Sequence, residues 1–322
     1  MVEVHRADRL AGGLGVGAFI SVGRSLDKAL ARVELAERLG YESVYVTHIA
    51  GYDSLSVLMA YAARTERVRL GTGVLPIYSR TPVATAQAAL TIDEFSGGRH
   101  VLGVGVSHRP VVEGWYGARI DKPVREMREY ASLLRAFFRG EEPPQGERFG
   151  SHFRFMGVEP RADLPIYIAA LSPAMLRLAG ELGDGVVLWL CNPGYIREVV
   201  IPEVTKGRER AGKPLEGFDV VAAVPTAVTD DPDAAREQLR ADLVPYFHLP
   251  FYQAMIERSG FPTDAGAPDE FLDVLAGIGD TDTAAATVER YREAGATSPC
   301  IGAVPKTDFD ATLEALGRLA AS

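Results

Sequence analysis

Short apolar runs alternate with helix-like stretches along most of this chain. The runs Leu70–Val74 and Val101–Val106 are rich in Val, Leu and Gly and are too short for helices, so they predict buried parallel strands. Between them, Thr81 can cap a helix, Pro82 suits its first turn, and the Ser-Gly-Gly sequence at 96–98 ends it. This stretch therefore predicts one β-α-β unit.

The same unit recurs along the chain. The phrase LAERLGYESVYV at 35–46 returns as LAGELGDGVVLWL at 178–190 and more loosely as YREAGATSPCIGAV at 291–304, each with a helix end, a glycine and a buried strand. Separate copies of a common local solution would look the same. Eight strands are predicted in all: Leu14–Ile20, Ser43–Thr47, Leu70–Val74, Val101–Val106, Pro165–Ala169, Gly185–Leu190, Phe218–Val224 and Ser298–Val304. The last helix is expected over Asp308–Ala320.

Eight such units predict the α/β class and a (β/α)8 TIM barrel, with a doubly wound open sheet as the alternative. One domain over residues 1–322 is expected, because barrels of this type often exceed 250 residues without splitting. Two insertions are predicted. The segment 140–163 lacks a helical period and resembles a hairpin, and 230–279 holds extra helices after strand seven. Both are candidates for a lid, or are plain insertions.

Charge and cysteine content narrow the choice of partners and compartment. The net charge is −9 and no run of Lys or Arg occurs, which argues against nucleic acid and anionic membranes as partners. Cys191 and Cys300 lie in apolar runs without metal-ligand spacing, so we expect free thiols, no metal and a cytoplasmic location. No apolar run approaches the roughly 20 residues that span a bilayer.

Candidate chemistry lies where strands end, since barrel enzymes place their active sites at the C-terminal rim. His48 follows the second strand, and Ser107, His108 and Arg109 follow the fourth. Histidine titrates near neutral pH and suits acid-base work, although a lone histidine more often makes a structural hydrogen bond. The turn Ala169–Ser172 opens the helix at Pro173, whose free N–H groups could bind an anion. An ordinary turn capped by Ser-Pro is equally consistent with that sequence.

Three stretches carry a family resemblance: LGTGVLPIYSRTPVATAQAALTIDEFSGGRHVLGVGVS at 70–107, His48, and AALSPAMLRLAGELGDGV at 169–186. Together they resemble the bacterial luciferase-like superfamily of flavin- and deazaflavin-dependent oxidoreductases, from about residue 14 to the C-terminus. Within it the chain is most similar to members assigned to coenzyme F420, a deazaflavin that carries hydride.

The resemblance implies a TIM barrel with the cofactor across its C-terminal rim. It places a cis peptide and a bulge at Gly73-Val74 behind the ring, which Ser107 would help to hold, and it places the cofactor phosphate at Ala169, Ala170, Leu171 and Ser172. Trp189 matches a position on the phosphate side. This chain has Thr47 where many relatives have Asp, His108 where some have a glutamate acid, and Leu171 and Ser172 where relatives have glycines.

The implied function is hydride transfer between F420 and an organic substrate, with His48 and His108 as the acid-base groups and Arg109 orienting an anionic substrate or the cofactor tail. The alternatives are an FMN-dependent monooxygenase and a non-catalytic flavin-binding protein. A hydrophobic or conjugated small molecule is the expected substrate, because the predicted loops are rich in aromatic residues, which could instead pack a lid. A homodimer is expected through the apolar helices at 53–64 and 82–95.

Overall fold

The fold is a closed parallel barrel, seen in a computed structural model that describes residues 15–319. The strands are β1 (Gly17–Phe19), β2 (Ser43–Val46), β3 (Arg69–Thr72), β4 (Leu75–Pro76), β5 (His100–Gly105), β6 (Ile166–Ala169), β7 (Gly185–Leu188), β8 (Asp219–Val228), β9 (Gly277–Gly279) and β10 (Ser298–Ala303). Eight of them pair in parallel in the order β1-β2-β3-β5-β6-β7-β8-β10, and β10 returns to β1. The predicted (β/α)8 barrel is confirmed, and the open sheet is wrong.

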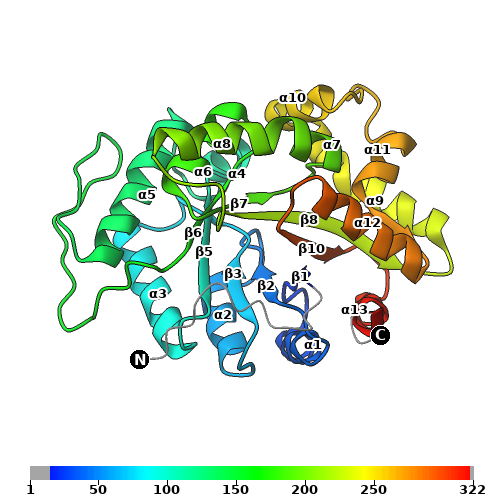
Figure 1. Ribbon diagram of the computed structural model, residues 1–322, viewed down its shortest axis with the longest axis horizontal. Helices are drawn as coiled ribbons and strands as arrows, with labels where there is room; N and C mark the ends of the chain where they lie inside the picture. The colour runs from blue at the N-terminus through cyan, green and yellow to red at the C-terminus, as the bar shows by residue number, and fades with distance from the viewer. Residues whose placement is uncertain (1–14, 320–322) are drawn as a thin grey trace.

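Helices surround the barrel (Figure 1). They are α1 (Leu26–Arg38), α2 (Ser54–Ala62), α3 (Pro82–Phe95), α4 (Arg109–Trp115), α5 (Pro123–Arg139), α6 (Pro173–Leu182), α7 (Pro193–Tyr195), the π-helical turn η1 (Ile196–Val200), α8 (Ile201–Arg210), α9 (Pro232–Phe247), α10 (Pro250–Arg258), α11 (Asp269–Leu275), α12 (Thr281–Glu293) and α13 (Phe309–Leu319). The predicted caps Ser25, Thr81 and Ser172 each accept a backbone N–H at the start of α1, α3 and α6. Leu14 and Ala320, the expected outer ends of the first strand and last helix, lie outside the described residues.

Large side chains fill the barrel interior. Its buried members are Tyr45, Val101, Tyr167, Val187, Val221 and Cys300, and Phe19 and Val74 pack on them. At the N-terminal ends of the strands, Asp219 accepts hydrogen bonds from the Tyr167 hydroxyl and, at 3.2 Å, from Arg69 Nη1. Side chains therefore fill the barrel interior, which is polar at the N-terminal ends of the strands. A ligand must bind outside this filled interior, at the C-terminal mouth of the barrel.

The segment between α5 and β6, residues 141–165, contains no helix or strand in the described structure, so the expected hairpin is wrong. Hydrogen bonds from its backbone to a side chain of α5, rather than pairing between strands, hold this segment in place. Glu129 on α5 accepts the backbone N–H groups of Glu147, Arg148 and Phe149. Figure 1 shows the segment looping out beside α5.

The extra helices expected within 230–279 are confirmed as α9, α10 and α11. Strand β9 follows them and pairs with the far end of β8, where Thr226 lies opposite Gly277. In Figure 1 these helices gather on the opposite side of the barrel from the 141–165 segment. Among residues 15–319, no helix has the length and apolar content needed to cross a membrane.

Candidate active site

The path from β3 to β4 contains a bulge. Leu70 lies opposite His100, but Leu75 lies opposite Val104, so β3–β4 carries one more residue than β5 over this distance. Thr72 bridges the gap with its side chain, because Oγ1 donates to the Gly103 carbonyl at 2.6 Å and accepts the Gly103 N–H at 2.8 Å. The Gly73-Val74 peptide bond is cis, as the family resemblance implied.

The side chain of Val74, which follows the end of β3, lies at the C-terminal side of the barrel interior. It is half-buried and packs on the interior cluster together with Phe19. The neighbouring strand makes room for it, because a Cβ added at Gly105 would lie only 2.7 Å from Val74 Cγ2. The glycines of the VLGVGV sequence therefore determine how far the Val74 side chain extends toward the mouth of the barrel.

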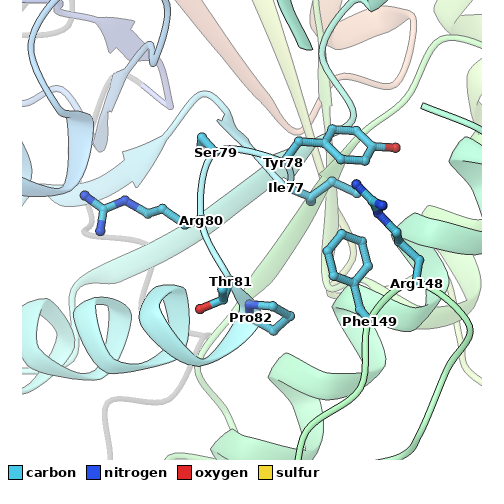
Figure 2. Close-up of a pocket in the computed structure, with 8 residues that line it drawn as sticks. All are labelled: Ile77, Tyr78, Ser79, Arg80, Thr81, Pro82, Arg148 and Phe149. Atoms are coloured by element: carbon cyan, nitrogen blue, oxygen red, sulfur yellow. The ribbon is translucent and has the colours of Figure 1, made fainter. Parts of the chain in front are cut away.

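The β4–α3 loop borders a crevice of about 250 Å³. Residues 77–82 form one side, and Arg148 and Phe149 of the 141–165 segment form the other. Figure 2 shows the Arg80 side chain pointing away from Arg148 and Phe149. The Tyr78 hydroxyl donates to the buried Glu126 carboxylate, and the Tyr78 ring lies 6.3 Å from that of Phe149, so the wall of the crevice is tied to α5.

His48 follows β2, and its side chain contacts the first residue of α2. Its Nδ1 accepts the Ser54 backbone N–H at 3.3 Å and lies 3.0 Å from Ser54 Oγ. Because a backbone N–H can only donate, Nδ1 must be unprotonated, which places the proton of the neutral ring on Nε2. Burial and nearby Arg80 hold the pKa of His48 below its usual value, against the opposing effect of Asp53.

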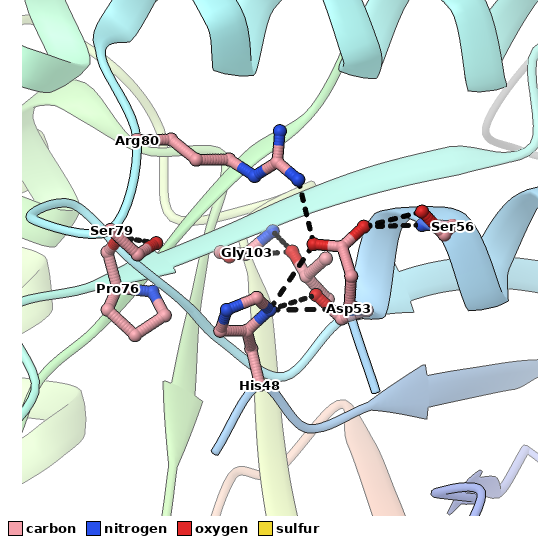
Figure 3. Close-up of polar contacts among 9 residues, drawn as sticks. His48, Asp53, Ser56, Pro76, Ser79, Arg80 and Gly103 are labelled. Atoms are coloured by element: carbon pink, nitrogen blue, oxygen red, sulfur yellow. Dashed lines mark hydrogen bonds and ion pairs between the residues drawn. The ribbon is translucent and has the colours of Figure 1, made fainter. Parts of the chain in front are cut away.

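Asp53 and Arg80 complete this polar group (Figure 3). Asp53 Oδ1 accepts from Arg80 Nη2 at 2.8 Å, and Oδ2 accepts from the backbone and side chain of Ser56 at 2.9 and 2.7 Å. The distance from Asp53 Oδ1 to His48 Nδ1 is 3.9 Å, too long for a hydrogen bond. Sequence reasoning missed Arg80 as a partner of this group, because only the strand order shows that residues 27 positions apart meet.

His108 lies in an aromatic cluster. Its ring stacks on Phe251 at 5.3 Å and meets the edges of Tyr252 and Tyr246 at 5.7 and 6.4 Å. Its buried Nδ1 has no hydrogen-bond partner among the described residues, and burial lowers its pKa. The structure thus brings the helices of the 230–279 segment over the end of β5, which no local sequence pattern predicts.

The two residues that flank His108 in the sequence, Ser107 and Arg109, do not belong to the aromatic cluster. Ser107 adopts a φ of 56°, in the left-handed region. Arg109 pairs with Glu113 on α4 and donates to the Ile120 carbonyl at 2.8 Å. Arg109 therefore stabilises the α4 region. Within the described structure, no hydrogen bond or ring contact joins His48 to His108, so the two histidines occupy separate environments.

The predicted anion-binding turn lies at the end of β6. Ser172 caps α6 by accepting the Met175 N–H at 3.4 Å, Ala170 is buried, and the Leu171 carbonyl accepts from Tyr195 Oη at 2.7 Å. On the adjoining loop, the buried Asn192 caps α7 with Oδ1, while its Nδ2 has no partner among the described residues. Trp189 lies beside Tyr246, with ring centroids 5.8 Å apart.

Comparison with known proteins places the chain in a family. The family model described as luciferase-like monooxygenase matches residues 6–298. An oxidoreductase of Mycobacterium tuberculosis, provisionally named as coenzyme F420-dependent, is 33% identical over 82% of this chain and 87% of its own length. The 5,10-methylenetetrahydromethanopterin reductase of Archaeoglobus fulgidus is 31% identical over 89% of this chain and 92% of its own length.

A solved structure shares the fold. The coenzyme F420-dependent tetrahydromethanopterin reductase of Methanopyrus kandleri superposes with a TM-score of 0.83, covering 95% of this chain and 98% of its own, at 23% identity. The chain is therefore an enzyme of the luciferase-like monooxygenase family, as its resemblance to the bacterial luciferase-like superfamily predicted.

Proposed function

We propose that this enzyme transfers a hydride between coenzyme F420 and an organic substrate at the mouth of the barrel. The position of Val74 carries the proposal. The bulge and Gly105 place its apolar side chain between the filled barrel interior and the C-terminal mouth, where it can support a planar ring. Two relatives with F420 in their names support the choice of cofactor. When bound, F420 would supply the hydride donor or acceptor.

The residues at the mouth fit such a cofactor. Among residues 15–319, the buried His108 Nδ1 and Asn192 Nδ2 have no hydrogen-bond partners, and a deazaflavin ring with a phosphate-bearing tail supplies hydrogen-bonding groups for such atoms. The first turn of α6 adds free backbone N–H groups, which favour a phosphate. These polar atoms and the N–H groups of α6 therefore fit the hydrogen-bonding groups of the cofactor.

The cofactor-binding residues divide into two groups. Gly73, Val74 and Ser107 would support the ring, because they lie at the ends of β3 and β5 where the interior cluster meets the mouth. The turn Ala169, Ala170, Leu171 and Ser172 would hold the phosphate at the start of α6. Larger Leu171 and Ser172 in place of family glycines leave the backbone donors available, since phosphate binding at a helix start uses N–H groups.

His48 and His108 are the proposed acid-base groups. For each hydride that reaches a substrate carbon, one proton must reach the heteroatom that takes up the electron pair, and the reverse reaction returns both. His48 presents Nε2–H, and His108 is a neutral ring in an aromatic cluster whose Nδ1 has no partner in the described part of the chain. Both histidines are suited to hold or move that proton at the mouth.

The aromatic residues favour a hydrophobic or conjugated substrate. Phe153 and Phe155 pack against Phe137, so they are part of the outer core. Other aromatic side chains surround His108 at the mouth: Tyr246, Phe251 and Tyr252. Phe251 is 39% exposed and could stack on a flat substrate.

Single-turnover oxidation of reduced F420 by enones, quinones, imines and ketones tests the proposal. We expect one class to react, and the His48→Gln and His108→Gln variants to slow the chemical step by about 10²–10⁴-fold for whichever histidine moves the proton. An unchanged rate in the double variant would remove both histidines from the mechanism. Tight FMN binding with oxygen consumption would instead favour a monooxygenase, and bound cofactor that no substrate turns over would favour a binding protein.

A further inference from the structure

The start of α2 presents hydrogen-bond donors to one nitrogen of His48. Ser54 is the first residue of α2 and is fully buried, and both its backbone N–H and its hydroxyl lie within hydrogen-bond distance of Nδ1. An imidazolium carries a proton on both nitrogens, so a charged His48 would point an N–H at the Ser54 N–H. The positive end of the α2 dipole opposes a cation at the same place.

We propose that Ser54 and Arg80 are positioning residues that hold His48 with its proton on Nε2, so that it meets the substrate as a hydrogen-bond donor. The use of this donor in catalysis rests on the proposed function. The positioning itself is a property of the protein without cofactor.

Asp53 could act against this arrangement. A carboxylate beside Nδ1 normally draws a proton onto that nitrogen and favours the imidazolium. Here both carboxylate oxygens are occupied, Oδ1 by Arg80 at 2.8 Å and Oδ2 by Ser56. The Arg80 guanidinium also neutralises the carboxylate charge. Arg80 therefore prevents Asp53 from becoming the partner of His48.

The geometry leaves Nε2 for the substrate. Figure 3 shows every interaction of the ring leaving from Nδ1, with the second nitrogen on the other side of the ring from Asp53. Asp53 from the start of α2 and Arg80 from the β4–α3 loop are the charged groups that act on the ring. His48 is thus positioned to donate a hydrogen bond to a substrate oxygen or nitrogen as negative charge develops there.

Nitrogen NMR of the histidine rings in the full, cofactor-free chain tests the arrangement. We expect His48 to show the Nε2–H tautomer at pH 7. In Arg80→Met the freed Asp53 carboxylate should raise the His48 titration by about one pH unit, and Arg80→Lys should restore part of the shift. Arg148→Met is the matched control, because Arg148 lines the same crevice but belongs to no part of this group.

An Nδ1–H tautomer in the wild type, or an Arg80→Met titration identical to that of Arg148→Met, would overturn the proposal. A second readout is the pH profile of the single-turnover rate, whose acid limb should move with the NMR titration in Arg80→Met and return in Arg80→Lys. Should the NMR result hold while F420 fails to bind, the proposed function fails and the positioning stands. Circular dichroism of each variant checks folding.

Discussion

At the residue scale, the lack of a side chain at Gly105 leaves the space that the Val74 side chain occupies. A methyl group at Gly105 would sit 2.7 Å from Val74 Cγ2, so Gly105→Ala must push Val74 upward or sideways at the mouth. We expect at least about a ten-fold loss of F420 affinity, which corresponds to about 1.4 kcal/mol, measured by titration. Gly114→Ala on α4 is the control, because no heavy atom of the neighbouring described residues lies within 4 Å of its added Cβ. Equal affinity in both variants would contradict the role of Val74.

A second residue-scale prediction concerns His100 at the start of β5. Burial lowers its pKa to about 4, and its Nδ1 bonds the Leu70 carbonyl at 3.0 Å. The unfolded chain binds a proton near pH 6.5 and the folded chain does not, so stability falls as the pH drops from about 6.5 to 4. The loss from this group is on the order of 3 kcal/mol.

Urea unfolding at several pH values measures this effect. His100→Asn keeps a donor for Leu70 and removes the titration, so its stability should vary less with pH over this window than that of the wild type. A variant with the same pH dependence as the wild type would show that His100 is not the source.

At the scale of elements, Glu129 holds the 141–165 segment on α5. Burial acts to raise the pKa of Glu129, but three backbone N–H bonds outweigh it and the pKa lies below its usual value. The stabilising effect is therefore present above about pH 4.5 and is lost as the pH falls through the lower folded-state pKa. Glu37 makes the same arrangement with Glu66, Arg67 and Val68 ahead of β3.

We expect Glu129→Gln to speed amide hydrogen exchange at residues 147–149 by about ten-fold, because bonds to a charged acceptor contribute roughly 1.5 kcal/mol or more. Exchange in the barrel strands should stay unchanged. Glu142→Gln, an exposed glutamate of the same segment paired with Arg154, is the control. Exchange at 147–149 that is equally fast in both variants would show that the carboxylate does not hold the segment.

The sequence predicts an element well when residues close together in the chain determine that element. Strands and caps follow from residues within a few positions of each other, so the barrel and the caps Ser25, Thr81 and Ser172 were predicted correctly. The hairpin prediction failed because Glu129 and aromatic contacts, far from the segment in sequence, replace strand pairing. The Asp53–Arg80 pair and the aromatic cluster on His108 also depend on partners that only the folded chain brings together.

At the scale of the whole molecule, the sequence predicts a dimer through α2 and α3. The structure buries most large apolar residues of both helices, but Phe95 at the end of α3 is 57% exposed. Sedimentation at micromolar concentration should show a species of twice 34.7 kDa, and Phe95→Ser should shift it toward the monomer. A single species near 34.7 kDa in the wild type would contradict the dimer.

In the proposed enzyme, the mouth of the barrel next to Val74 binds coenzyme F420 for hydride transfer. Anaerobic titration of the purified, cofactor-free enzyme with F420 and, separately, with FMN tests it most directly. We predict saturable F420 binding at least about ten-fold tighter than FMN binding, a difference of about 1.4 kcal/mol or more. This binding should weaken in Gly105→Ala and stay unchanged in Gly114→Ala. Tight binding of FMN with weak or no binding of F420 would contradict the account.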